Sequence, residues 1–261
     1  MPRISSPGPA EDAADPASTA AGWTCRPWAS AAVFGEPVPL EVSRWRVAPA
    51  ARTPDIPLGE TESLAYVIAG SGTASASPPD AAGEPFAVST ESVLWLPACD
   101  SLTLEAGLDG LDVLVARSTA PAVDGGFPAV RKAFAAAELP HLVSTRDTRD
   151  RLDLVTENVP VGARAIRADR IIYHPGDTAA AHYHTDCHHV FCVLAGSGLL
   201  YDGERAHRLE AADSALVGPG EVHWFENDRA AEFSFVEFWA PPPAQTIWTV
   251  PGDRCTWAPA T

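Results

Sequence analysis

The chain has 261 residues, of which 46% are hydrophobic and 20% are charged, and its formal net charge is −16. This composition is typical of a globular protein with an ordinary core, and no apolar run approaches the roughly 20 residues that span a bilayer. The negative charge argues against nucleic acids and anionic membranes as partners, because both repel an acidic surface.

The amino-terminal segment, residues 1–22, is rich in Ala, Pro, Ser and acidic residues and lacks the apolar core of a signal peptide. We expect it to be a disordered leader. The chain also has five cysteines, an odd number at no framework spacing: Cys25, Cys99, Cys187, Cys192 and Cys255. Without an export signal, these residues favour reduced thiols in a cytoplasmic protein.

The chain contains an internal repeat. Residues 61–72 (TESLAYVIAGSG) align without gaps with residues 187–198 (CHHVFCVLAGSG), 126 positions later. Residues 92–98 likewise match residues 214–220, 122 positions later. Self-similarity at this spacing predicts two copies of one domain.

Both copies read as short apolar strands separated by Gly, Pro and Asp turns, which is typical of an all-β sandwich or barrel. Between them, residues 128–139 (PAVRKAFAAAEL) predict a helix, since proline begins the segment and Pro140 follows it. We therefore expect an amino-terminal barrel over 23–121, a linker with this helix over 122–165 and a carboxy-terminal barrel over 166–261.

Seven of the eight histidines lie between His174 and His223. Residues two apart in a strand project from the same face, so His182 and His184 can direct two ring nitrogens at one point. Imidazole suits borderline metals such as iron, zinc, copper and nickel. The pattern predicts a metal site, with His223 as a further ligand after a Gly-Pro-Gly turn.

These residues resemble the motifs of the cupin superfamily. The first motif of that family is a glycine, five residues, His-x-His, three or four residues, a glutamate, six residues and a glycine. The chain has four of these at the same intervals: Gly176, His182, His184 and Gly196. The second motif ends in Pro-x-Gly, two residues, histidine, three residues and asparagine. It is matched by Gly220, His223 and Asn227, with Gly218 in place of the proline.

The chain departs from the family pattern at the glutamate, whose position holds His189 after His188. Counting six residues back from Gly196 selects His189 as the ligand, and strand alternation directs His188 to the opposite face. The corresponding positions of the first copy cannot bind a metal; they are Ile56, Leu58, Ser63 and Ser101.

The resemblance implies a bicupin, that is, two tandem cupin barrels with the double-stranded β-helix (jelly-roll) fold. It implies one divalent metal per chain, in the second barrel, bound by His182, His184, His189 and His223. The first barrel would then be structural, and a homodimer is the expected assembly.

The expected metal site lies in an aromatic pocket. Alternation from His189 directs Phe191 and Val193 to the interior. In the last strand, alternation leaves two possibilities. Either the residues Phe233, Phe235, Glu237 and Trp239 face inward, or the residues next to them in sequence do. Such a wall is typical of a small-molecule pocket. If Glu237 is buried there, its pKa is raised and it is the candidate catalytic acid or base; the alternative is an outward, solvated carboxylate.

Four neutral imidazoles leave the metal its full positive charge, which favours an anionic or chelating small-molecule substrate. Our main hypothesis is an iron(II) oxygenase or dioxygenase, because cupins with histidine in place of the glutamate include such enzymes. Zinc, manganese, nickel or copper would also suit the site. One alternative is a non-oxidative aminohydrolase, isomerase or decarboxylase, since bicupin ureidoglycine aminohydrolases have a similar architecture. The other is a non-catalytic binding cupin.

Overall fold

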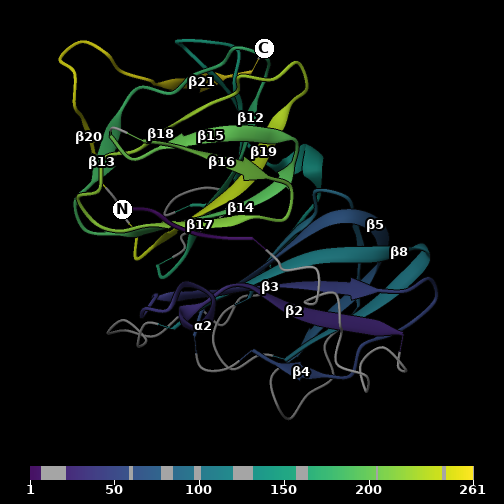
Figure 1. Cartoon of the computed structure of the whole chain (residues 1–261). Helices are drawn as coiled ribbons and strands as arrows, with labels where there is room; N and C mark the ends of the chain where they lie inside the picture. Colours follow the sequence, from purple (N-terminus) through teal and green to yellow (C-terminus); the bar gives the residue numbers. More distant parts are fainter. Residues whose placement is uncertain are drawn as a thin grey trace.

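The structure is a computed structural model of the chain, and it describes residues 1–6, 22–58, 61–77, 85–96, 101–119, 132–156, 164–203, 205–242 and 245–260. Within these ranges the chain is nearly all β, as the sequence predicts (Figure 1). The described helical elements are α2 (Ala31–Phe34) and one 3-10 turn, η1 (Ala136–Glu138). None of the described helices is long and apolar enough to cross a membrane.

The amino-terminal half is built on one sheet with strand order β2-β3-β8-β5-β7-β9, to which β4 adds on β8 and β6 on β5. Its strands are β2 (Trp23–Ala29), β3 (Leu40–Val47), β4 (Ile56–Pro57), β5 (Ser63–Ser77), β6 (Phe86–Ser89), β7 (Val93–Leu96), β8 (Ser101–Ser118) and β9 (Lys132–Phe134).

The carboxy-terminal half has an eight-stranded sheet with order β1-β17-β14-β19-β12-β11-β10-β21, and two smaller sheets, β16-β15-β18 and β13-β20. Its strands are β1 (Arg3–Ser5), β10 (His141–Ser144), β11 (Asp150–Val155), β12 (Arg167–Tyr173), β13 (His182–His184), β14 (His188–Ala195), β15 (Ser197–Tyr201), β16 (Ala206–Glu210), β17 (Ser214–Val217), β18 (Trp224–Glu226), β19 (Phe233–Ala240), β20 (Thr246–Trp248) and β21 (Trp257–Pro259).

The sequence repeat corresponds to a repeat of topology. The order β3-β8-β5-β7 in the first half returns as β12-β19-β14-β17 in the second. Each central strand has an irregularity at the same place, after Val67 in β5 and after Val193 in β14. The glycines that follow, Gly70 and Gly196, have positive φ, and a Cβ on them would lie 2.1 Å from the carbonyl oxygen of Gly110 and 2.0 Å from that of Glu232, respectively. Only glycine fits this close approach.

The strand register corrects one equivalence in the repeat. Ile56 pairs with Leu102 in the first half, whereas His182 forms the matching bridge with His223 in the second. The counterpart of His223 is therefore Leu102 and not Ser101. A gapless comparison of short apolar segments places them only to within one residue, because neighbouring apolar positions look alike in sequence. Leucine cannot bind a metal either, so the expectation for the first half is unchanged.

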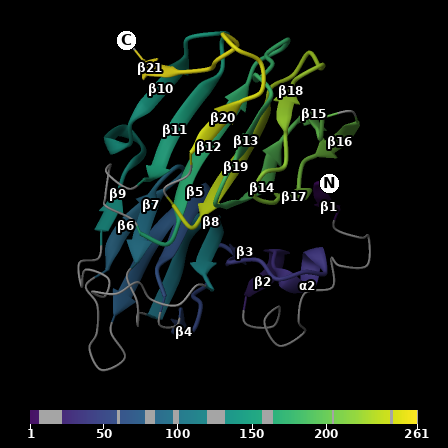
Figure 2. The ribbon, with the colours of Figure 1, turned by 90° about the vertical axis from the view of Figure 1, so that its left-hand side faces the viewer.

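The amino-terminal segment is not wholly the disordered leader that we expected. Arg3, Ile4 and Ser5 form β1, which pairs antiparallel with β17 at the edge of the carboxy-terminal sheet (Figure 2). The edge of β17 offers unpaired backbone groups, and β1 satisfies them. Residues 7–21, the rest of the expected leader, lie outside the described residues.

The helix expected over 128–139 is not found in its described part. Lys132–Phe134 form β9 against β7, followed only by the 3-10 turn η1, and residues 128–131 lie outside the described residues. Pairing with the free edge of β7 outweighs the helical preference of the alanines. Residues 141–155, expected within the linker, contain β10 and β11, which extend the carboxy-terminal sheet.

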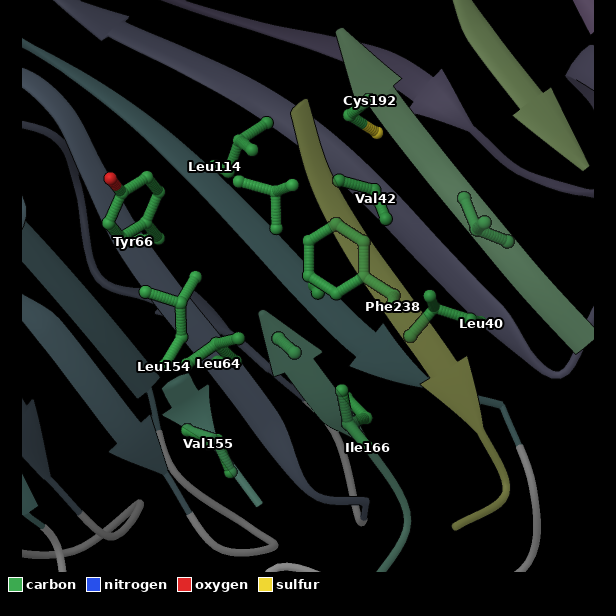
Figure 3. Close-up of a cluster of buried hydrophobic side chains, with 14 of the residues drawn as sticks. Leu40, Val42, Leu64, Tyr66, Leu114, Leu154, Val155, Ile166, Cys192 and Phe238 are labelled. Atoms are coloured by element: carbon green, nitrogen blue, oxygen red, sulfur yellow. The ribbon is translucent and has the colours of Figure 1, made fainter. Parts of the chain in front are cut away.

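The buried hydrophobic side chains of the described residues form three clusters. One lies within the first half and one within the second, and the third lies between them. Figure 3 shows this intermediate core, where Leu64 and Leu114 of the first half meet Ile166 and Phe238 of the second. The side chains of β19 alternate across its sheet: Phe238 belongs to the intermediate core, and its neighbours in sequence line the cavity described next.

Candidate metal centre

His182 and His184 lie on β13, a three-residue strand that pairs antiparallel with β20. Because they are two residues apart in a strand, both rings project to the same side, with their centroids 5.0 Å apart. Trp248, opposite His182 in this pairing, places its ring 5.2 Å from the ring of His182. The two rings of the His-x-His pattern therefore lie on one side of the strand, as strand alternation predicts, and their role as metal ligands stays a prediction.

The turn before β18 brings His223 to this pair. The amide of Gly220, whose φ is +75°, donates to the carbonyl of His184 at 2.7 Å. His223 then exchanges two main-chain hydrogen bonds with His182, of 2.8 and 3.2 Å. The ligand nitrogens of His182, His184 and His223 all lie within 4.8 Å of one another. They are the one such metal-binding group among the residues that the structure describes.

Hydrogen bonds at the other ring nitrogens fix the tautomers of two of these histidines. His182 Nδ1 lies 2.8 Å from the carbonyl oxygen of Ala180, and His223 Nδ1 lies 3.0 Å from that of Glu221. A carbonyl only accepts, so Nδ1 carries the proton and Nε2 presents a lone pair. Nε2 of His184 is buried without a hydrogen-bond partner. Such nitrogens fit a metal ion, since ligating histidines usually donate their other N–H to an acceptor.

Burial lowers the pKa of His182, His184 and His223, and neighbouring histidines lower the pKa values of His184 and His223 further. The three rings are therefore neutral at pH 7. Metal binding requires neutral imidazole, so the site does not have to lose protons before it binds an ion.

His189, on β14, lies beside the three histidines. Its side chain is buried, its ring centroid is 4.9 Å from that of His184, and its Nδ1 is 3.3 Å from Nε2 of His223. His188 is directed away from the cluster and is only half-buried. The orientation predicted for the two neighbours is confirmed, whereas a ligand role for His189 stays a prediction.

Of the two predicted orientations of the last strand, the structure shows the one in which Phe233, Phe235, Glu237 and Trp239 face inward. Phe191, Val193, Phe233 and Phe235 belong to the core of the carboxy-terminal half, while Glu237 and Trp239 line the cavity next to the histidines. Oε2 of Glu237 lies 3.3 Å from Nε2 of His189. Burial raises the pKa of Glu237, although Arg151 and Arg167 oppose the shift. Glu237 is thus an inward carboxyl group, not a solvated one.

The histidines line a cavity of about 190 Å³, and part of its wall was not predicted from the sequence. Its wall also includes three arginines, Arg149, Arg151 and Arg167. Arg149 and Arg151 are two residues apart, so a strand would direct both side chains to one face. Their charged segment has the composition of an exposed linker, however, and they were not selected from the sequence. The cavity is smaller than the roughly 300–1,000 Å³ of typical ligand pockets, so it suits a small substrate.

Each of the three arginines contacts an aspartate. Nε of Arg149 donates to Asp147 at 2.8 Å, Arg151 contacts Asp153 at 2.5 Å, and Nε of Arg167 donates to Asp169 at 3.2 Å.

The guanidinium of Arg149 also bonds to the hydroxyl of Tyr173 and the thiol of Cys255, and that of Arg167 lies 4.7 Å from the ring centre of Trp239. If every group carries its formal charge, the three arginines and their three aspartates sum to zero, and Glu237 gives the site a net charge of −1. A divalent metal would reverse that sign and favour an anion.

The remaining histidines take other partners. His141 and His174 each contact a different oxygen of Asp150 at 2.9 Å, and His207 contacts Asp202 at 2.9 Å. Asn227 of the second motif is buried, and its amide donates to the carbonyls of Tyr173 and Ala231. Its role is to hold the loop before β19. Cys25, Cys187, Cys192 and Cys255 are free thiols, and Cys99 lies outside the described residues.

The fold is an all-β, cupin-like jelly roll, and its histidine cluster lines a cavity in the carboxy-terminal half. Residues 169–239 match the family model of the cupin domain. No curated protein sequence matches the chain.

Solved structures share the fold. A single-residue variant of oxalate decarboxylase from Bacillus subtilis matches with a TM-score of 0.71 and 13% identity, over 87% of this chain and 75% of that one. The Lactobacillus farciminis oxalate decarboxylase formate complex matches with 0.70 and 14%, over 87% and 84%. The E. coli protein Ylba, of the family DUF861, matches with 0.66 and 17%, over 84% and 83%.

Proposed function

We propose that this chain is a metal-dependent cupin enzyme with one divalent metal ion, bound by His182, His184, His189 and His223. The observation that supports it most is the convergence of three ligand nitrogens within 4.8 Å, two of them on rings whose other nitrogen donates to a main-chain carbonyl. The orphaned, buried Nε2 of His184 fits the same purpose. A set of imidazoles suits iron(II), zinc, manganese, nickel or copper, and supply decides among them.

The substrate that fits this site is a small anion such as a carboxylate. The cavity is about 190 Å³, and the charged side chains that line it are three arginines and Glu237. Planar guanidinium groups recognise carboxylates through paired N–H donors. The metal, when bound, supplies a Lewis acid that polarises an oxygen of the substrate. Phe191, Trp239 and Trp248 give the cavity an aromatic wall beside the histidines.

We favour a non-oxidative reaction, namely a decarboxylation, hydrolysis or isomerisation. Each of these needs a group that gives or takes a proton at the substrate, and our candidate for this role is Glu237, which lines the cavity. The structural resemblance to oxalate decarboxylases agrees with this choice, although at 13–14% identity it concerns the fold alone.

The second candidate is the iron(II) oxygenase. It is favoured by the absence of a carboxylate from the four expected ligands, because an all-histidine site leaves the metal its full charge for an anionic chelator. The two candidates differ in their need for dioxygen.

The test uses protein purified without chelators, with its metal content measured first. Oxalate, malonate and pyruvate are then supplied in air and under argon, and products are quantified by NMR together with oxygen consumption. We expect equal turnover in both atmospheres and its loss in the His182→Ala variant. Turnover that requires oxygen would establish the oxygenase instead. Ligand binding without turnover of any compound would favour a non-catalytic binding protein.

The repeated topology supports a bicupin organisation in which the first half is structural. Its positions at the site are Ile56, Leu58, Ser63 and Leu102, none of which binds metals. We propose a homodimer as the assembly, and light scattering coupled to size-exclusion chromatography tests it. A monomeric mass at micromolar concentration would contradict the dimer without affecting the metal site.

A further inference from the structure

We propose that the amino-terminal strand β1 belongs to the metal centre, where Arg3 holds the turn that carries His223. Arg3 does not line the cavity and acts through Glu221, so it is a positioning residue. Its effect on metal affinity rests on the proposed function. Its effect on the turn does not, because the contacts involved are all made by the chain itself.

The turn that carries His223 has few fixed points of its own. Residues 218–222 follow β17 and belong to no strand. On the side of the site, the amide of Gly220 donates to the carbonyl of His184, and His223 exchanges two main-chain hydrogen bonds with His182. The position of His223 therefore depends on how the rest of this turn is held.

Glu221 connects the two ends of the turn. Its Oε2 accepts a hydrogen bond from the amide of Gly218 at 2.7 Å, and its main-chain carbonyl accepts one from Nδ1 of His223 at 3.0 Å. Acceptors of this kind orient the ring of a metal-binding histidine. Whatever fixes the side chain of Glu221 therefore also fixes the direction of the His223 ring.

Arg3 fixes the side chain of Glu221. Its Nη1 donates to Oε2 at 2.8 Å and to Oε1 at 3.0 Å, and its Nη2 contacts Glu36 of the first half at 2.8 Å. The terminal amine of Met1 contacts the same carboxylate of Glu221 at 2.5 Å. The side chains of Arg3, Glu36 and Glu221 are all partly buried. A planar guanidinium with two carboxylate partners is held in one geometry better than a simple surface pair.

The main chain of β1 holds the strand that leads into the turn. Arg3 pairs with Leu216 and Ile4 pairs with Ala215, and β1 contacts both β17 and α2 (Figure 2). One element thus fixes the strand before the turn and the carboxylate within it. A ligand that is held in place before the metal arrives loses less conformational freedom on binding, and this preorganisation raises affinity.

The first test needs no metal and follows amide hydrogen exchange of the metal-free full chain by NMR. The amides of Gly220 and His223 report how often the turn leaves the site. Arg3→Ala should speed their exchange about 3–5-fold, the upper range for a partly exposed ion pair. The amide of Asn227, which donates to Asp177 at the far end of β18, is the control for global unfolding and should change less. Unchanged exchange at Gly220 and His223, or equal acceleration at all three amides, would overturn the proposal.

The second test is zinc affinity, measured by competition with a chromophoric chelator. Arg3→Ala should weaken binding about 3–5-fold, and Arg3→Lys, which keeps a cation without the planar fork, should recover part of the loss. Arg208→Ala is the matched control. Arg208 and Asp228 form an ion pair of similar exposure in the same half, and neither residue lines the cavity.

A double-variant cycle tests whether Arg3 acts through Glu221. Glu221→Gln keeps an acceptor for Gly218 and removes the charge that Arg3 binds, so the double variant should bind zinc no more weakly than the weaker single variant. Additive losses, or a loss in Arg208→Ala as large as in Arg3→Ala, would contradict the positioning role. A wild-type chain that binds no zinc, iron or manganese would refute the proposed function itself, and the exchange rates would still decide whether Arg3 holds the turn.

Discussion

Phe238 is the residue whose truncation best tests how the two halves are joined. It is fully buried in the intermediate core (Figure 3), and its neighbours on β19, Glu237 and Trp239, line the cavity on the opposite face. Truncation of a buried phenylalanine to alanine costs about 3–5 kcal/mol, through lost burial and the cavity left behind. For a domain of 150–250 residues each kcal/mol lowers Tm by about 2–4 °C, so Phe238→Ala should lower it by about 6–20 °C.

The assay is differential scanning calorimetry of the full chain. Because the intermediate core contains residues of both halves, we expect one cooperative transition that shifts as a whole in the variant. Leu108→Ala is the control, since Leu108 is 88% exposed and its truncation should change stability by less than about 0.5 kcal/mol. Two separate transitions, of which only one shifts in Phe238→Ala, would refute the reasoning.

Three further changes probe other parts of the account. His182→Ala should abolish metal binding, measured by elemental analysis, while the far-ultraviolet circular dichroism spectrum is retained; loss of the fold would contradict a preformed site. Burial beside Asp169 raises the pKa of Asp153 to about 7. Because the pKa of Asp153 is higher in the folded chain than in the unfolded chain, protonation of this carboxyl group favours the folded state. That contribution to stability is complete below the ordinary pKa of an aspartate and is lost as the pH rises toward 7. Asp153→Asn should therefore gain stability relative to the wild type between pH 5 and pH 8 in urea titrations, and a constant difference would count against the shift. Removal of residues 1–6 should lower Tm, since β1 covers the edge of β17 and Arg3 binds Glu221 at 2.8 Å; an unchanged Tm would show that this pairing contributes nothing.

The residues that sequence reasoning placed correctly are those governed by strand alternation. His182 and His184, His189 against His188, and Phe191 all face the side that a period of two assigns to them. Alternation alone left two choices for the last strand. Its pairing with β14, which sets Phe191 opposite Glu237, decides between them, and no local pattern carries that register.

The misplaced segments are those whose local preference is overruled by an open strand edge. Lys132–Phe134 lie in an alanine-rich stretch that favours a helix, yet they complete β7. Arg3–Ser5 lie in a segment of low-complexity composition, yet they form a strand that pairs with the edge of β17. Arg149 and Arg151 were passed over for a related reason, because a charged segment reads as linker until β11 is seen to join the sheet beside the cavity.

The central claim is that histidines from distant parts of the chain bind one metal ion in the carboxy-terminal half. X-ray absorption spectroscopy at the edge of the bound metal tests it most directly, on wild-type protein purified without chelators and on the His223→Ala variant. We predict one ion per chain with imidazole scattering, and fewer imidazoles or no ion in the variant. A wild-type chain without metal, or a metal with the same surroundings in both proteins, would contradict the account.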